Sequence, residues 1–196
     1  MADLVAIRRD IERAFAEVAY PGDDNIVRGS TETSTRIVQA FRGRNWRDLP
    51  VRELNASGEL AEALDLMTPS AFRYFLPGFM LLGLGEVERD VGNVGNMAEA
   101  ALQFRIDRSS GDLLSKSLPA YSRQIEENRK EAISGVLGLD TRQMIAVRGY
   151  LIVKREYIAE LLGSSSAART LLDPLNNSVR YLDQLIKWKQ EMSGGA

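Results

Sequence analysis

The sequence predicts an all-α protein, and three observations lead to this prediction. Apolar residues recur at steps of three and four through most of the chain, the spacing that gives a helix one buried face. Proline and glycine fall at the borders of these stretches, where helices begin and end. No stretch shows the sustained alternation of a half-buried strand. With 196 residues, 44 % of them hydrophobic, we expect one globular domain of about seven to nine helices.

Capping residues and glycine or proline stops divide the first third of the chain. Asp3 is a suitable N-cap for the first helix, and Pro21-Gly22 follows its end. We expect these elements in order: a helix over 3–18, a loop over 21–30, a helix from Ser30 or Thr31 to Gly43, a connector over 46–50 and a short helix over 57–66.

A central buried helix is predicted after Thr68-Pro69, a hydroxyl N-cap followed by proline at the first helical position. Residues 70–84 are apolar nearly all round, as in a helix that is buried on every side. Pro77 is expected to kink or split this helix, because proline removes a backbone donor. Gly83-Leu84-Gly85 is expected to end it. Its aromatic residues are assigned to the core: Phe72, Tyr74, Phe75 and Phe79.

Two further start signals define the C-terminal part. Asp140 and Gln143 form a capping box that opens a long helix to about Leu162. Gly149 within it predicts the close approach of another helix. Asp173-Pro174 is expected to start the last helix, whose apolar residues are Leu175, Val179, Leu182, Leu185, Ile186 and Trp188. Between these parts we expect a loop over 90–96, a helix over 97–105, a break at 109–111, an irregular piece over 113–118 and a charged helix over 121–137.

The composition excludes several kinds of site. The chain has no cysteine and no histidine, so it cannot contain a thiol nucleophile, a Ser-His-Asp triad, or a zinc site built on these residues. Its 25 basic and 27 acidic residues give a net charge of −2, without the basic field of a typical nucleic-acid binder. The sequence therefore favours a non-enzymatic protein without metal or cofactor, and it argues against a nucleic-acid partner.

The sequence also bears on location. No stretch reaches the ~18 to 20 apolar residues that span a bilayer. The first nine residues contain no apolar run of signal-peptide length. We therefore expect a cytoplasmic protein that does not contact a membrane.

Three strings together resemble an uncharacterised bacterial domain family: YPGDDNI at 20–26, FRGRNW at 41–46 and TPSAFRYFLPGF at 68–79. A fourth string, from Leu139 to Leu151, is similar to the family's closing segment. The resemblance covers roughly residues 7–155 and implies a small, mostly helical domain, with no reaction attached. We therefore divide the chain into a helical core, 1–155, and a C-terminal helical extension, 156–196, packed on the same domain.

Asp23 and Asp24 are adjacent carboxylates on a predicted loop. One interpretation is a metal or acid–base site, as in a carboxylate-dependent hydrolase or a divalent-metal enzyme. Neighbouring residues do not naturally present both carboxylates to one point, however, so an Asx-type turn or a contact with an arginine is favoured. A pair between Asp24 and Arg42 or Arg73 would lock the fold.

Arginines surround Trp46 in the second string. Arg42, Arg44 and Arg47 beside an aromatic ring could hold single-stranded nucleic acid by charge and stacking, in a regulatory protein. The same residues could instead cover the tryptophan ring within the protein. The net charge of the chain favours the second interpretation. Arg73 and Tyr74 have polar ends that need partners, inside the protein or outside it.

The charge is uneven along the chain. Residues 1–141 carry a net charge of −5 and residues 142–196 a net charge of +3. Proteins of this size and character are often encoded beside bacterial toxins. The working hypothesis is a protein-binding module, most concretely an immunity-type protein that occludes a basic toxin domain, while the sequence leaves the oligomeric state open. The candidate partner-binding residues are Asp23, Asp24, Arg42, Arg44, Trp46, Arg73 and Tyr74.

Overall fold

A computed structural model describes residues 3–56, 63–89, 98–102, 106, 135–163 and 165–194. The fold is all-α, as predicted; over these ranges there is no strand, and Val27 and Met67 form an isolated bridge. No helix in these ranges is both long and apolar enough to cross a membrane. The elements are α1 (Leu4–Phe15), the 3-10 helix η1 (Asp23–Asn25), α2 (Glu32–Phe41), α3 (Val51–Ala56), α5 (Ala63–Leu66), α6 (Pro69–Arg89), α9 (Thr141–Leu162) and α10 (Ser166–Gly194).

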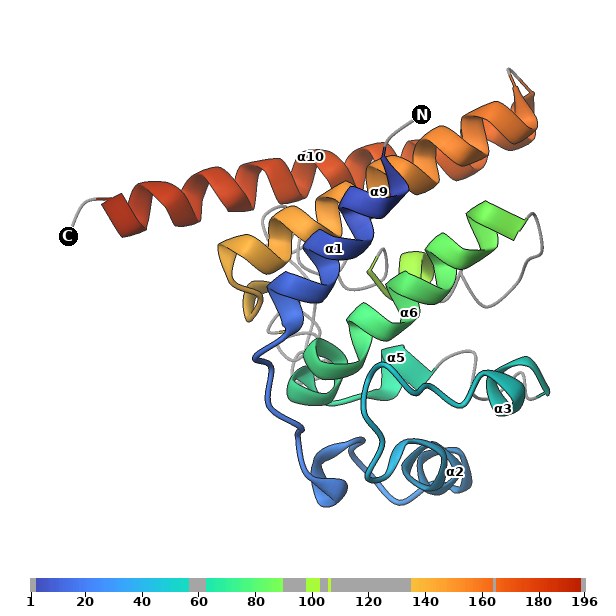
Figure 1. Ribbon diagram of the computed structural model, residues 1–196, viewed down its shortest axis with the longest axis vertical. Helices are drawn as coiled ribbons and strands as arrows, with labels where there is room; N and C mark the ends of the chain where they lie inside the picture. Colours follow the sequence, from blue (N-terminus) through green and yellow to red (C-terminus); the bar gives the residue numbers. More distant parts are fainter. Residues whose placement is uncertain are drawn as a thin grey trace, which may run out of the picture.

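The helices pack around α6 and α9 (Figure 1). Helix α1 contacts both of them, and α5 contacts α6. Helix α10 runs along α9 as the outermost helix, while α2 and α3 lie at the opposite end of the molecule (Figure 1). Helix α9 continues across residue 155, so one helix joins the predicted core to the predicted extension. The bulkiest fully buried side chains are Trp46, Tyr150, Phe15, Phe41, Phe72, Phe75 and Phe79. Three of these phenylalanines lie on α6, which confirms the aromatic core assigned to that helix.

The predicted caps of α1, α2 and α9 are confirmed. Asp3 accepts hydrogen bonds from the first turn of α1, and Thr31 Oγ1 accepts one from Ser34 N at 3.1 Å. At the start of α9, Gln143 N donates to Asp140 Oδ1 at 2.8 Å and Asp140 N donates to Gln143 Oε1 at 3.1 Å. A cap satisfies donors that the first helical turn leaves open, so these starts are set locally.

Gly149 lies where α9 meets α1. A Cβ at this position would be 3.0 Å from Ile7 Cδ1 of α1. The predicted close approach of a second helix is therefore confirmed.

Helix α6 departs from its prediction at its C-terminal end, because it continues to Arg89 instead of ending at Gly83–Gly85. It is one helix across Pro77, which excludes the predicted split and leaves the kink as the other alternative. Leu84 is fully buried between the two glycines. Burial of this stretch outweighs the cost of glycine in a helix, about 1 kcal/mol each.

The predicted start of α10 at Asp173-Pro174 is wrong. The helix begins at Ser166, and Pro174 lies inside it. Ser165 Oγ accepts a hydrogen bond from Ala168 N at 3.1 Å, which caps the earlier start. Ala168 and Leu175 are both buried. Packing of the first two turns therefore offsets the donor that Pro174 removes.

The remaining predicted elements are covered only in part. Helix α3 was not predicted; it follows Pro50, whose carbonyl accepts from Leu54 N. Helix α5 and the helical residues 98–102 and 135–137 agree with three predicted helices. The rest of those predictions, together with the loop over 90–96, the break at 109–111 and the piece over 113–118, lies outside the described residues.

Candidate functional site

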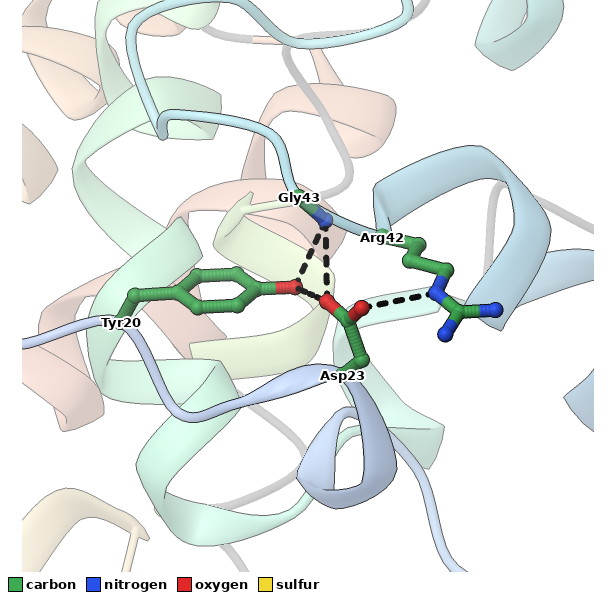
Figure 2. Close-up of polar contacts among 4 residues, drawn as sticks. All are labelled: Tyr20, Asp23, Arg42 and Gly43. Carbon is green, nitrogen blue, oxygen red and sulfur yellow. Dashed lines mark hydrogen bonds and ion pairs between the residues drawn. The ribbon is translucent and has the colours of Figure 1, made fainter.

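The loop after α1 brings Asp23 to the end of α2. Gly22 has φ +88°, a backbone conformation that favours glycine, and it turns the chain into η1. Gly43 has φ +65° and ends the turn that follows α2. Tyr20, Asp23, Arg42 and Gly43 meet here, and we name these four residues the corner (Figure 2).

The Asp23 carboxylate is the centre of the corner. Its Oδ1 accepts from the Tyr20 hydroxyl at 2.7 Å and from Gly43 N at 3.2 Å. Its Oδ2 accepts from Arg42 Nε at 2.7 Å. Gly43 N also donates to the Tyr20 hydroxyl oxygen at 2.8 Å. Each carboxylate oxygen is thus used to join the loop after α1 to the end of α2, as Figure 2 shows.

These hydrogen bonds shift the pKa values of the three titratable side chains of the corner. Hydrogen bonds from the Tyr20 hydroxyl and the Arg42 guanidinium lower the pKa of Asp23. Burial and the bond to Asp23 raise the pKa of Tyr20, and the bond to Asp23 also raises the pKa of Arg42. Asp23 is therefore ionised and Tyr20 protonated near neutral pH. Arg42 uses Nε toward Asp23 (Figure 2), on a side chain that is 65 % exposed.

Tyr20 also connects the corner to the aromatic core. Its ring meets the edges of Tyr74 and Phe75, with centroids 5.3 and 6.4 Å apart. Phe41, next to Arg42, contacts Phe75 at 5.0 Å and Phe79 at 6.0 Å. The three strings at 20–26, 41–46 and 68–79 thus meet in one structural unit, although they are far apart in sequence.

Asn25 and Thr68 fix the same loop to the start of α6. Thr68 Oγ1 donates to the Asn25 carbonyl at 2.7 Å, and Asn25 Nδ2 donates to Ser70 Oγ at 2.9 Å. Asp24 lies between the bonded residues Asp23 and Asn25 and is itself exposed. The predicted contact between an aspartate and Arg42 is therefore present, but it is made by Asp23, and Asp24 acts on Arg42 only through its charge.

Trp46 is buried, with 2 % of its surface exposed. The guanidinium of Arg47 lies 3.9 Å from the ring centroid, so an arginine covers the indole within the protein. Arg44 instead reaches Glu53 at 3.6 Å. Gly78 of α6 packs directly beneath the segment, since a Cβ there would be 2.1 Å from the Trp46 carbonyl oxygen. The indole is thus part of the internal packing.

The guanidinium of Arg73 has a hydrogen-bond partner inside the protein, and the ring of Tyr74 packs in the core. Arg73 Nη1 donates to the Gly138 carbonyl at 3.2 Å, just before α9. Lys189 of α10 holds the same connection, with Nζ donating to the Leu137 and Leu139 carbonyls. Tyr74 is 6 % exposed, and its ring meets Tyr20 and Phe75. These contacts tie α6 and α10 to the start of α9.

The structure thus brings only part of the candidate set together. Asp23 and Arg42 belong to the corner, Asp24 is exposed beside it, and the Tyr74 ring meets Tyr20. Arg44, Trp46 and Arg73 make separate contacts. Sequence reasoning missed Tyr20 and Gly43, although both stand in the strings that it singled out. Within the described ranges, no group of three or more acidic, cysteine or histidine side chains is placed to hold a metal ion.

Comparison with protein-family models, with curated proteins and with solved structures found no significant match to this chain. The function is therefore argued from the geometry of the protein itself.

Proposed function

We propose that this protein is a cytoplasmic binding module, most concretely an immunity-type protein that occludes a bacterial toxin. The observation that carries the proposal is an apolar surface at the end of α10. Trp188 is 52 % exposed and Met192 is 66 % exposed, one helical turn apart. This end of α10 extends past the start of α9 in Figure 1.

Side chains of this kind favour a protein partner. Tryptophan is enriched among the residues that contribute most to binding free energy, and methionine adapts its shape to a partner. Lys187 and Glu191, on the same part of α10, are exposed and lie 3.9 Å apart. An apolar centre beside charged groups is the usual arrangement of a protein interface.

The charge pattern supports the basic toxin domain as partner. Residues 1–141 carry a net charge of −5, which would attract such a domain before contact. Asp24 and Arg42 are the most accessible members of the candidate set, because Trp46 and Tyr74 are buried. In this proposal the end of α10 anchors the partner, and exposed charges such as Asp24 steer its approach.

Capture of the partner from the native organism tests this proposal. The tagged wild type should retain one protein in stoichiometric amount, and Trp188→Ala should weaken capture at least tenfold, a loss of about 1.4 kcal/mol. Leu171→Ala is the matched control, since Leu171 is 50 % exposed on the same helix. It should capture like the wild type.

A growth assay then tests the immunity role. The captured protein should inhibit growth when expressed alone, the wild type should relieve this inhibition, and Trp188→Ala should not. A captured protein without toxicity would refute the immunity role. Equal capture by the wild type and Trp188→Ala would refute the proposed surface.

A further inference from the structure

The end of α10 that carries the proposed binding surface packs little against the rest of the protein. Among residues 187–192, every side chain except that of Lys189 is exposed, and Lys189 is half-buried. As Figure 1 shows, this end of α10 runs past the start of α9. A helical turn without tertiary contacts is only marginally stable in water. The contacts of Lys189 are therefore important for the order of this end.

Lys189 binds the end of α10 to the connection before α9. Its Nζ donates to the Leu137 carbonyl at 2.9 Å and to the Leu139 carbonyl at 2.5 Å. Residues 135–137 are helical, and the last carbonyls of a helix have no partner within it. A lysine ammonium is a favourable donor to such carbonyls, because they form the negative end of the helix dipole. Both bonds come from a charged donor, which makes them stronger than bonds between neutral groups.

The connection that accepts these bonds is itself held in place. Val136 and Leu139 are fully buried. Arg73 Nη1 of α6 donates at 3.2 Å to the Gly138 carbonyl, which lies between the two carbonyls that Lys189 binds. Three consecutive carbonyls thus accept hydrogen bonds from cations of α6 and α10. Lys189 therefore attaches the end of α10 to a well-fixed part of the core.

The direction of Lys189 also sets the direction of the two exposed apolar residues. Successive residues of an α-helix point about 100° apart, so Trp188 and Met192 lie on the same side of Lys189. We propose that Lys189 is a positioning residue for the proposed binding surface: its two bonds fix the last turns of α10 and hold Trp188 and Met192 outward as a preformed pair. A preformed surface binds more tightly, because less conformational entropy is lost on binding. The role in binding rests on the proposed function, whereas the order of α10 does not.

Hydrogen exchange of the full-length protein tests the order of this end. In Lys189→Met the amides of residues 187–192 should lose most of their protection, while those of residues 144–153 in α9 keep theirs. Lys189→Arg retains the charge and should keep most of the protection. Lys187→Met removes the same charge from the same part of the helix, at a side chain that is 78 % exposed, and should change the exchange by at most about twofold. Unchanged exchange in Lys189→Met, or exchange raised equally along α9, would overturn the proposal.

Partner capture tests the consequence for binding. Lys189→Met should capture at least about threefold less than the wild type, because the apparent affinity falls with the fraction of molecules whose binding surface is ordered. Lys189→Arg should retain most of the capture, and Leu171→Ala is again the control. Undiminished capture by Lys189→Met, with its protection lost, would overturn the positioning role. If no variant and no wild type captured a protein, the proposed function would fail, and the exchange experiment would still decide whether Lys189 orders the end of α10.

Discussion

Two pairs of carboxylate and cation in this protein have nearly the same length but opposite surroundings. Asp23 and Arg42 meet at 2.7 Å on the surface, and Glu99 and Lys154 meet at 3.0 Å in the interior. The Asp23 carboxylate also accepts bonds from a hydroxyl and a backbone amide. The pKa of Asp23 is lowered, whereas that of Glu99 is raised by burial.

The difference shows that distance alone does not decide how such a pair behaves. Hydrogen bonds to the charged form stabilise the ion, and loss of water destabilises it. At the corner the donors prevail, because water still reaches both side chains. In the interior the loss of water prevails over the charge of Lys154 and the hydrogen bonds to the Glu99 carboxylate. The contribution of the corner to the free energy of unfolding should therefore fall in acid. The contribution of the interior pair should fall as the pH rises toward neutral.

The largest effect is expected for Lys154→Met. This variant leaves the Glu99 carboxylate buried without its cation, which should cost about 3 to 5 kcal/mol at neutral pH. Urea unfolding measures the loss. The double variant Glu99→Met with Lys154→Met should recover most of it, because methionine fills a similar volume without charge. A double variant as unstable as Lys154→Met would show that packing, not charge, sets the cost.

Tyr20→Phe should have the next largest effect. It removes the hydroxyl that bonds to Asp23 and Gly43 but keeps the ring between Tyr74 and Phe75, so we expect a loss of about 1 kcal/mol in urea unfolding. Tyr181→Phe, on α10 and away from the corner, is the matched control and should change little. Equal losses in the two variants would show that the Tyr20 hydroxyl stabilises the fold no more than the Tyr181 hydroxyl does.

Asp23→Asn should act mainly on the pH dependence. The stabilisation from a carboxylate with a lowered pKa is present above its ordinary value of 3.8 and is lost as the pH falls through the lowered value. In thermal unfolding at several pH values, Asp23→Asn should flatten this acid decline. Asp24→Asn removes the neighbouring exposed carboxylate and should retain the wild-type decline. If Asp24→Asn flattened the acid decline and Asp23→Asn retained it, the stabilising carboxylate would be that of Asp24.

The smallest effect is expected for Arg42→Lys. Lysine keeps the positive charge, but it has no Nε–H in the position from which arginine donates to Asp23. Stability at neutral pH should hardly change, since the pair is exposed to solvent. The acid decline should be slightly smaller and should end at a higher pH than in the wild type, because the pKa of Asp23 is lowered less. The same thermal unfolding series would detect this change.

Much of the fold could be predicted because its signals are local. The Thr31 cap, the Asp140–Gln143 box and the limits of α9 each depend on residues within one or two helical turns. The start of α10 could not be predicted in this way. The sequence favours Asp173-Pro174, whereas in the structure the Ser165 cap and the packing of Ala168 start the helix at Ser166. Tertiary burial outweighed a strong local signal there.

The candidate site was predictable only as separate pieces. The sequence suggested a contact between an aspartate of this loop and Arg42, but it chose Asp24 instead of Asp23, because a contact across 19 positions depends on how the loop after α1 turns. Glu99 and Lys154 are 55 positions apart and stand in no motif. Their pairing follows from the docking of one stretch of chain on another, which helix periodicity does not encode.

Carboxyl-carbon NMR titration of the wild-type protein tests the central claim most directly, since it needs no variant. The claim is that hydrogen bonds govern Asp23 and burial governs Glu99. We predict a midpoint below 3.8 for Asp23 and above 4.5 for Glu99, on opposite sides of their ordinary values. A Glu99 midpoint at or below 4.5 would contradict the account, because it would mean that Lys154 more than compensates for the loss of water.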